Sequence, residues 1–124
     1  MNQGPKTLKI LVVDDSQAVS DVLAQLCNFL GHEVLIATNG AEALTLMEKG
    51  IHIDMVFTDY KMPVMDGVEM TKRIKAEYPD FPVVLITGSV AVSGFDIEGA
   101  NFDAVVQKPF ELKAIAESID RFFP

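Results

Sequence analysis

Apolar residues gather in five short runs along the chain, and each run has the length of a buried strand. The runs are rich in Val, Ile and Leu and alternate little with polar residues, which is typical of strands covered on both faces. The predicted strands span residues 8–13, 33–37, 54–58, 82–86 and 103–107. Helical spacing of apolar residues fills most of the segments between them, so the pattern predicts alternating strands and helices.

Four predicted helices have recognisable ends. In the first, apolar residues recur at three-and-four spacing, and Gly31 is well placed to end the helix. The second and third begin with capping-box patterns, Asn39 with Glu42 and Asp66 with Glu69. The four helices are predicted over about residues 16–30, 39–50, 66–78 and 110–122.

The segment between the fourth and fifth strands is the weakest helical candidate. Residues 88–99 contain three glycines together with Val90, Val92 and Ser93. Each glycine costs a helix about 1 kcal/mol relative to alanine. We therefore expect only a short or mobile helix there, over about residues 91–99.

Alternating strands and helices predict an α/β fold with a parallel sheet, right-handed crossovers and helices on both faces. The expected architecture is a doubly wound, flavodoxin-like (βα)5 three-layer sandwich, with five parallel strands in the order 2-1-3-4-5. A chain of 124 residues favours a single domain over 1–124, with its core over about 8–122. In this order, a ligand would bind beyond the carboxyl ends of the first and third strands.

Composition narrows the possible partners and the compartment. The net charge of −8 argues against direct binding of nucleic acid, which needs a basic surface. No apolar run approaches the length of a membrane span, and the N-terminus has no apolar signal-peptide core. The single cysteine, Cys27, cannot form an internal disulfide, so we expect a cytoplasmic protein.

Polar residues with complementary chemistry follow four of the predicted strands. They are Asp14 and Asp15, Asp59, Thr87 and Lys108. Because parallel strands end on the same edge of a sheet, these side chains are expected to converge. Three close carboxylates repel one another unless a cation joins them, and Mg²⁺ suits carboxylates, waters and a phosphate oxygen. We expect Asp15 and Asp59 to bind Mg²⁺ directly, and Asp14 to bind it directly or through a water.

Asp59 has a second possible role as a nucleophile, because a carboxylate can attack phosphorus and form an aspartyl phosphate. Catalysis would then rest on positioning and on neutralising the phosphoryl oxygens. Lys108 offers an ammonium for this purpose, and Thr87 offers a hydroxyl. The bond between Lys108 and Pro109 is a candidate cis peptide that would turn the chain and aim Lys108 into the site.

Four motifs in this order resemble the receiver domains of two-component response regulators, the CheY-like family. They are Leu11–Ser16, Thr58–Gly67, Leu85–Gly88 and Val106–Phe110, and the resemblance spans about residues 8–122. It implies that Asp59 accepts a phosphoryl group from a phosphohistidine on a sensor histidine kinase or a histidine phosphotransfer protein. It also implies Mg²⁺ held by Asp14, Asp15 and Asp59, with the backbone carbonyl of Lys61 as a further candidate ligand.

The resemblance also implies how the signal leaves the site. Thr87 and Lys108 would sense the phosphoryl group and change the face formed by the fourth helix, fifth strand and fifth helix. That face would meet an output domain, a target protein or a second copy of the chain. Such a domain is a phosphoprotein switch and not a turnover enzyme, although it can hydrolyse its own aspartyl phosphate.

The chain departs from the family pattern at the position three residues before the conserved lysine. Family members usually carry an aromatic residue there, and this chain has Val105. The usual relay from threonine to aromatic cannot operate as such, and Phe102 occupies a different strand position. The glycine-rich fourth segment is therefore expected to carry part of the output. Lys61 and Ser89 lie at the two positions that tune the lifetime of the phosphoryl group in the family. Lys61 could contact the phosphoryl group, crowd the attacking water or be solvated, and these alternatives stay open.

Three other functions compete with the switch. An aspartate-nucleophile phosphohydrolase usually has a second acid two residues after the nucleophile, where this chain has Lys61. A flavin-binding electron carrier would need a phosphate loop after the first strand, and Asp14 and Asp15 would repel a flavin phosphate. A degenerate receiver acting only as a binding module is disfavoured because Asp59, Thr87 and Lys108 are all present.

Overall fold

The computed structural model describes residues 6–88, 96–97 and 99–124. Five parallel strands form one sheet in the order β2-β1-β3-β4-β7, so the predicted strand order is confirmed. The strands are β1 (Lys9–Val13), β2 (Glu33–Ala37), β3 (Met55–Thr58), β4 (Val83–Thr87) and β7 (Ala104–Gln107). The helices within the described residues are α1 (Gln17–Phe29), α2 (Gly40–Glu48), α3 (Gly67–Glu77) and α4 (Leu112–Phe122).

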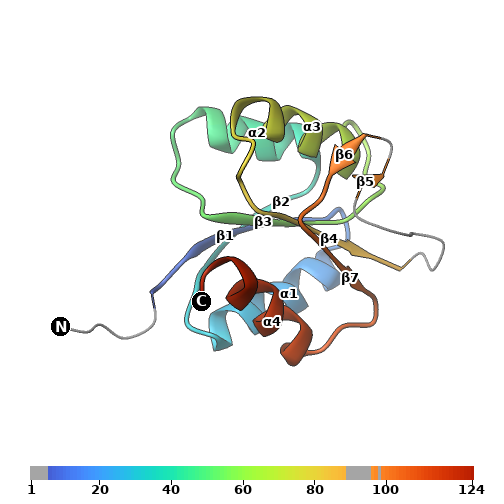
Figure 1. Ribbon diagram of the computed structural model, residues 1–124. Coiled ribbons are helices and arrows are strands. Elements are labelled where there is room, and N and C mark those ends of the chain that lie inside the picture. The colour runs from blue at the N-terminus through green and yellow to red at the C-terminus, as the bar shows by residue number, and fades with distance from the viewer. Residues whose placement is uncertain (1–5, 89–95, 98) are drawn as a thin grey trace.

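The sheet is covered on both faces, and Figure 1 shows α2 and α3 on one side with α1 and α4 on the other. Each face has its own apolar cluster. One cluster includes Leu23 and Cys27 of α1 with Ile115 and Ile119 of α4. The other packs α2 and α3 against the opposite face of β1, β3 and β4. Burial on both faces explains why the strands read as continuous apolar runs.

Side-chain caps define the starts of three helices. The Ser16 hydroxyl accepts from Val19 N at 3.4 Å, Asn39 Oδ1 accepts from Glu42 N at 2.9 Å, and Asp66 Oδ1 accepts from Glu69 N at 2.9 Å. The predicted starts of α1, α2 and α3 are therefore confirmed to within a residue or two.

The fourth helical segment differs from the expectation. Residues 96–97 form strand β5 (Asp96–Ile97), which pairs antiparallel with β6 (Ala100–Asn101). Gly99, with φ +86, lies in the turn between them, a conformation that L side chains rarely adopt. The expectation of a helix over 91–99 was therefore wrong at 96–97, and residues 91–95 and 98 lie outside the described residues.

A polar network ties α3 to the starts of β4 and β7. Asp103 Oδ2 accepts from Val83 N at 2.8 Å and from Lys75 Nζ at 2.6 Å. Lys75 Nζ also donates to Phe81 O at 2.7 Å, and only 13% of its side chain is exposed. This network closes the end of the sheet opposite the acidic strand ends.

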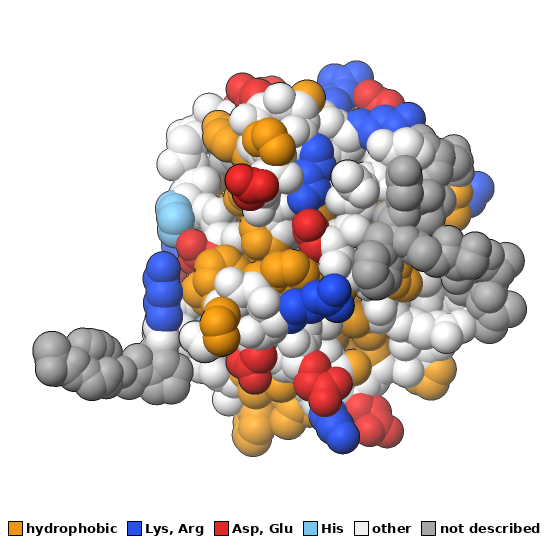
Figure 2. Space-filling model, viewed as in Figure 1, with side chains coloured by type: hydrophobic (Ala, Val, Ile, Leu, Met, Phe, Trp, Pro, Cys, Tyr) orange, Lys and Arg blue, Asp and Glu red, His pale blue; other side chains and the backbone are white. Residues whose placement is uncertain are grey.

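The surface has mixed charge over one face of the molecule. In Figure 2, Asp and Glu side chains are dispersed among Lys and Arg side chains and apolar ones. No helix among the described residues is both long and apolar enough to cross a membrane.

Candidate functional site

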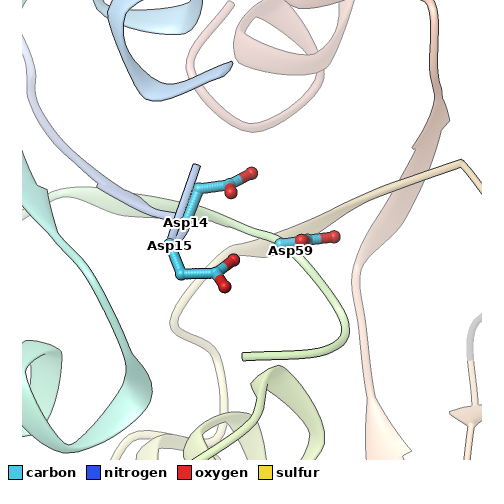
Figure 3. Close-up of side chains that lie close together, drawn as sticks. All are labelled: Asp14, Asp15 and Asp59. Carbon is cyan, nitrogen blue, oxygen red and sulfur yellow. The ribbon is translucent and has the colours of Figure 1, made fainter. Parts of the chain in front are cut away.

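Three aspartates lie where two neighbouring strands end. Asp14 and Asp15 follow β1, and Asp59 follows β3, which pairs in parallel with β1. Figure 3 shows their carboxyl groups pointing into the same space, and one oxygen from each lies within 4.8 Å of the others. Asp14 is buried, Asp59 is partly buried and Asp15 is exposed. The pairing of β1 with β3 therefore creates an acidic cluster that is open to solvent on the Asp15 side.

Backbone amides hold the cluster in place. The amide of Asp59 donates to Val13 O at 2.9 Å and so continues the ladder between β3 and β1. Asp14 Oδ1 accepts from Ser16 N at 2.8 Å, and Asp59 Oδ1 accepts from Tyr60 N at 2.8 Å. One oxygen of each of these two carboxylates is thus oriented by the backbone that follows it.

Lys108 reaches the cluster from the end of β7. Its Nζ lies 3.7 Å from Asp14 Oδ2 and 3.6 Å from Asp59 Oδ1. Its amide donates to the carbonyl of Thr87 at 2.8 Å, and the bond between Lys108 and Pro109 is cis. Thr87 is buried at the end of β4. The parallel sheet therefore brings Asp14, Asp59 and Lys108 into contact across about 95 positions of sequence.

Asp14 is the buried member of the cluster, and burial perturbs its carboxyl group. Burial raises the pKa of its carboxyl above the ordinary value of 3.8, and the charges of Asp59 and Asp15 raise it further. The Ser16 amide and the Lys108 ammonium act in the opposite direction. Asp14 Oδ2 is buried and has no hydrogen-bond partner among the described residues. The Lys108 ammonium, 3.7 Å away, is beyond hydrogen-bond reach of this oxygen, so its burial stays costly unless another cation approaches it more closely.

This donor set fits a hard divalent cation. The three aspartates supply oxygen ligands, and one of these oxygens accepts no hydrogen bond within the described part of the chain. Mg²⁺ prefers oxygen ligands and commonly retains waters, which the open side at Asp15 admits. The residues of the cluster are therefore compatible with a metal site.

The segment after Asp59 folds tightly back onto it. The amide of Gly67 donates to Tyr60 O at 2.9 Å, and the Thr58 hydroxyl donates to Asp59 O at 2.8 Å. A Cβ on residue 67 would overlap Asp59 O, so only glycine fits there. The sequence motif contains Gly67 but does not reveal this contact. One feature of the sequence could have indicated the contact. Gly67 directly follows the N-cap Asp66, at a position where residues with higher helix propensity are favoured.

The structure also describes Lys61 and Val105, two positions that the sequence comparison with the family pattern singled out. Lys61 Nζ lies 5.3 Å from the centroid of the Tyr60 ring, a cation–π contact on an exposed side chain. Val105 pairs with Leu85 of β4 and is partly buried against the cluster under α2 and α3. Phe102 is buried in that same cluster, before β7 begins. Ser89 lies outside the described residues.

The sequence model of the response regulator receiver domain matches residues 10–120. This chain belongs to the receiver domain family. Receiver domains are signalling domains of two-component response regulators, and their acidic pocket is typical of a phosphoacceptor aspartate. The fold and the acidic cluster agree with that membership.

Similar proteins show the range of architectures in which this domain occurs. The receiver domain is 34% identical over 119 residues to a chemotaxis protein CheY homolog of Campylobacter jejuni, covering 91% of this chain and 90% of the relative. It is 32% identical to the autoinducer 1 sensor kinase/phosphatase LuxN of Vibrio harveyi, covering 92% of this chain and 13% of LuxN.

A solved structure of similar fold is the response regulator protein TrrA of Thermotoga maritima, in complex with Mg²⁺ and BeF. It superposes with a TM-score of 0.84 at 28% identity, and the match covers 94% of this chain and 99% of TrrA.

Proposed function

We propose that Asp59 is the phosphoacceptor of this receiver domain and that Asp14, Asp15 and Asp59 bind the Mg²⁺ that transfer requires. The observation that carries the proposal is the convergence of three carboxylates and one ammonium at the ends of β1, β3 and β7. Asp59 is the partly buried member of the set, so it is oriented yet accessible.

The proposed reaction is an in-line displacement at phosphorus. A carboxylate oxygen of Asp59 attacks the phosphorus of a phosphohistidine on the partner, the phosphorus–nitrogen bond breaks, and the imidazole leaves with its electron pair and takes up a proton. Asp59 Oδ1 already accepts from Tyr60 N, so Oδ2 is proposed as the attacking atom. Positioning and charge neutralisation supply most of the rate in such transfers.

Lys108 and Thr87 are proposed to hold the phosphoryl group once it is on Asp59. Lys108 Nζ lies 3.6 Å from Asp59 Oδ1, close enough to follow an added phosphoryl oxygen. Thr87 stands at the end of the next strand, and its carbonyl accepts from the Lys108 amide, so the two residues are mechanically linked. Mg²⁺ bound by the aspartates would neutralise charge on the phosphoryl oxygens.

Relatives support this assignment and its partners. TrrA was solved with Mg²⁺ and BeF, and the LuxN relative is a sensor kinase/phosphatase. We accordingly propose a histidine kinase or a histidine phosphotransfer protein as the phosphoryl donor. A groove of about 630 Å³ between β7 and α4, lined in part by Val105, Phe110 and Arg121, is proposed as part of the output face. That face would receive a target protein, an output domain or a second copy.

The decisive experiment labels the chain with acetyl phosphate in the presence of Mg²⁺. Asp59→Asn is expected to abolish labelling while the far-UV circular dichroism stays native. Asp21→Asn, an exposed aspartate on α1, is the matched control and is expected to label normally. Labelling that survives in Asp59→Asn would place the acceptor elsewhere.

Metal binding has a separate test. Mg²⁺ at millimolar concentration is expected to raise the melting temperature, because it binds only the folded cluster and relieves carboxylate repulsion. Asp14→Asn and Asp15→Asn should each reduce this shift, whereas Asp21→Asn should retain it. An unchanged melting temperature of the native chain would refute the metal site.

A further inference from the structure

The backbone of Asp59 is the base of a closed segment between β3 and α3. Residues 60–66 leave Asp59 and return at Gly67, whose amide donates to Tyr60 O at 2.9 Å. The Cα of Gly67 packs on Asp59 O so closely that a Cβ there would overlap that oxygen. Both ends of the segment are therefore anchored at the backbone that carries the Asp59 carboxylate.

The tip of the segment is a strained turn. Met65 N donates to Pro63 O at 2.7 Å, and Val64 between them has φ +70. A bond that spans two residues around a positive φ is the rare and strained form of the γ-turn. Valine is poorly suited to this conformation because it is β-branched, and 84% of Val64 is exposed, so burial does not compensate. An outside contact has to keep the turn in this shape.

Gly40 makes such a contact. Its amide, at the first residue of α2, donates to Met65 O at 2.9 Å. A Cβ on residue 40 would lie 2.9 Å from both Met65 Cγ and Met70 Cβ, and 3.0 Å from Met65 O. Gly40 has no positive φ, so space is the reason for glycine here. The start of α2, which follows the edge strand β2, is thus in direct contact with the strained turn at Val64.

We propose that Gly40 is a positioning residue of the Asp59 site. By holding the Met65 carbonyl, it keeps the Val64 turn closed and so fixes Tyr60 and Lys61 beside the acidic cluster. The inference rests on the proposed function of Asp59 and Mg²⁺ described above. It gives a role to the end of β2, whose own side chains lie outside the acidic cluster.

The test measures Mg²⁺ affinity, by amide chemical shifts, alongside acetyl phosphate labelling. Gly40→Ala is expected to weaken Mg²⁺ binding by about tenfold, the usual effect of disturbing groups that orient metal ligands. Gly50→Ala is the matched control at the other end of α2, since Gly50 has φ +81 and a Cβ added to it would meet nothing within 4 Å. It should lower stability through backbone strain and leave Mg²⁺ affinity within about twofold.

A second substitution separates positioning from general damage. Val64→Gly removes the β-branched side chain from the strained turn, so the turn itself can absorb a shift of Met65 and pass less of it to Lys61. This substitution should therefore restore most of the affinity lost in Gly40→Ala. Should Gly40→Ala fail to fold, Asn39→Ala removes the cap on Glu42 N and loosens the same helix start, with a smaller loss of affinity expected.

The outcomes are distinct. Equal losses in Gly40→Ala and Gly50→Ala, or no recovery with Val64→Gly, would overturn the positioning role. A native chain that binds no Mg²⁺ and takes up no label would instead refute the proposed function itself.

Discussion

Asp103→Ala is expected to be one of the most destabilising substitutions outside the apolar core. Asp103 Oδ2 accepts from Val83 N at 2.8 Å and from Lys75 Nζ at 2.6 Å. Val83 is fully buried at the start of β4, and the Lys75 side chain is 13% exposed. Alanine would leave a buried amide without its acceptor and a largely buried ammonium without its carboxylate.

The two losses have different sizes. A buried amide left without a partner costs about 2 kcal/mol. Lys75 retains its bond to Phe81 O, so losing the carboxylate of a partly exposed pair adds about 1 kcal/mol. The expected loss of about 3 kcal/mol corresponds to a melting temperature lower by about 12 °C for a chain of this length.

Urea denaturation followed by circular dichroism measures the effect. Asp103→Asn keeps an acceptor for Val83 N and removes the charge, so it should cost only about 1 kcal/mol. Because Asp103 lies at the end of the sheet opposite Asp59, acetyl phosphate labelling per folded molecule should be unchanged in both variants. Equal losses in the alanine and asparagine variants, or a loss below about 1 kcal/mol in alanine, would refute the assigned role of the acceptor.

Three further predictions concern the site and its loop. Val64→Gly should raise stability by about 1 kcal/mol, since relief of positive φ outweighs the added entropy of glycine, and Val64→Ala should change it little in thermal unfolding. Gly67→Ala should cost at least about 2 kcal/mol in urea denaturation and lower labelling, because its Cβ would overlap Asp59 O. Burial raises the pKa of Asp14 above 3.8, so the folded chain binds this proton more tightly than the unfolded chain. Without metal, the contribution of Asp14 to the free energy of unfolding should therefore fall as pH rises from about 3.8 through the folded pKa. In Asp14→Asn, the free energy of unfolding, measured by urea denaturation at several pH values, should depend less on pH across that window.

Local information in the sequence determined much of this fold. Continuous apolar runs mark strands buried on both faces, and caps such as Asn39 and Asp66 mark helix starts, since both signals depend on neighbouring residues alone. The convergence of Asp14, Asp59 and Lys108 followed from one topological fact, that parallel strands end on the same edge. The helix expected over about 91–99 is wrong at 96–97, because glycine content disfavours a helix without specifying the antiparallel pairing with residues 100–101 that forms instead.

Contacts between distant elements were decided only by the tertiary structure. The sequence predicts that three aspartates meet, yet the burial of Asp14 and the exposure of Asp15 depend on what packs around the end of β1. Local sequence patterns likewise do not reveal three contacts between distant segments. They are Gly40 with Met65, Gly67 with Asp59, and Lys75 with Asp103. Their physical basis is close approach and desolvation, and both are properties of packed surfaces that no single segment of the chain contains.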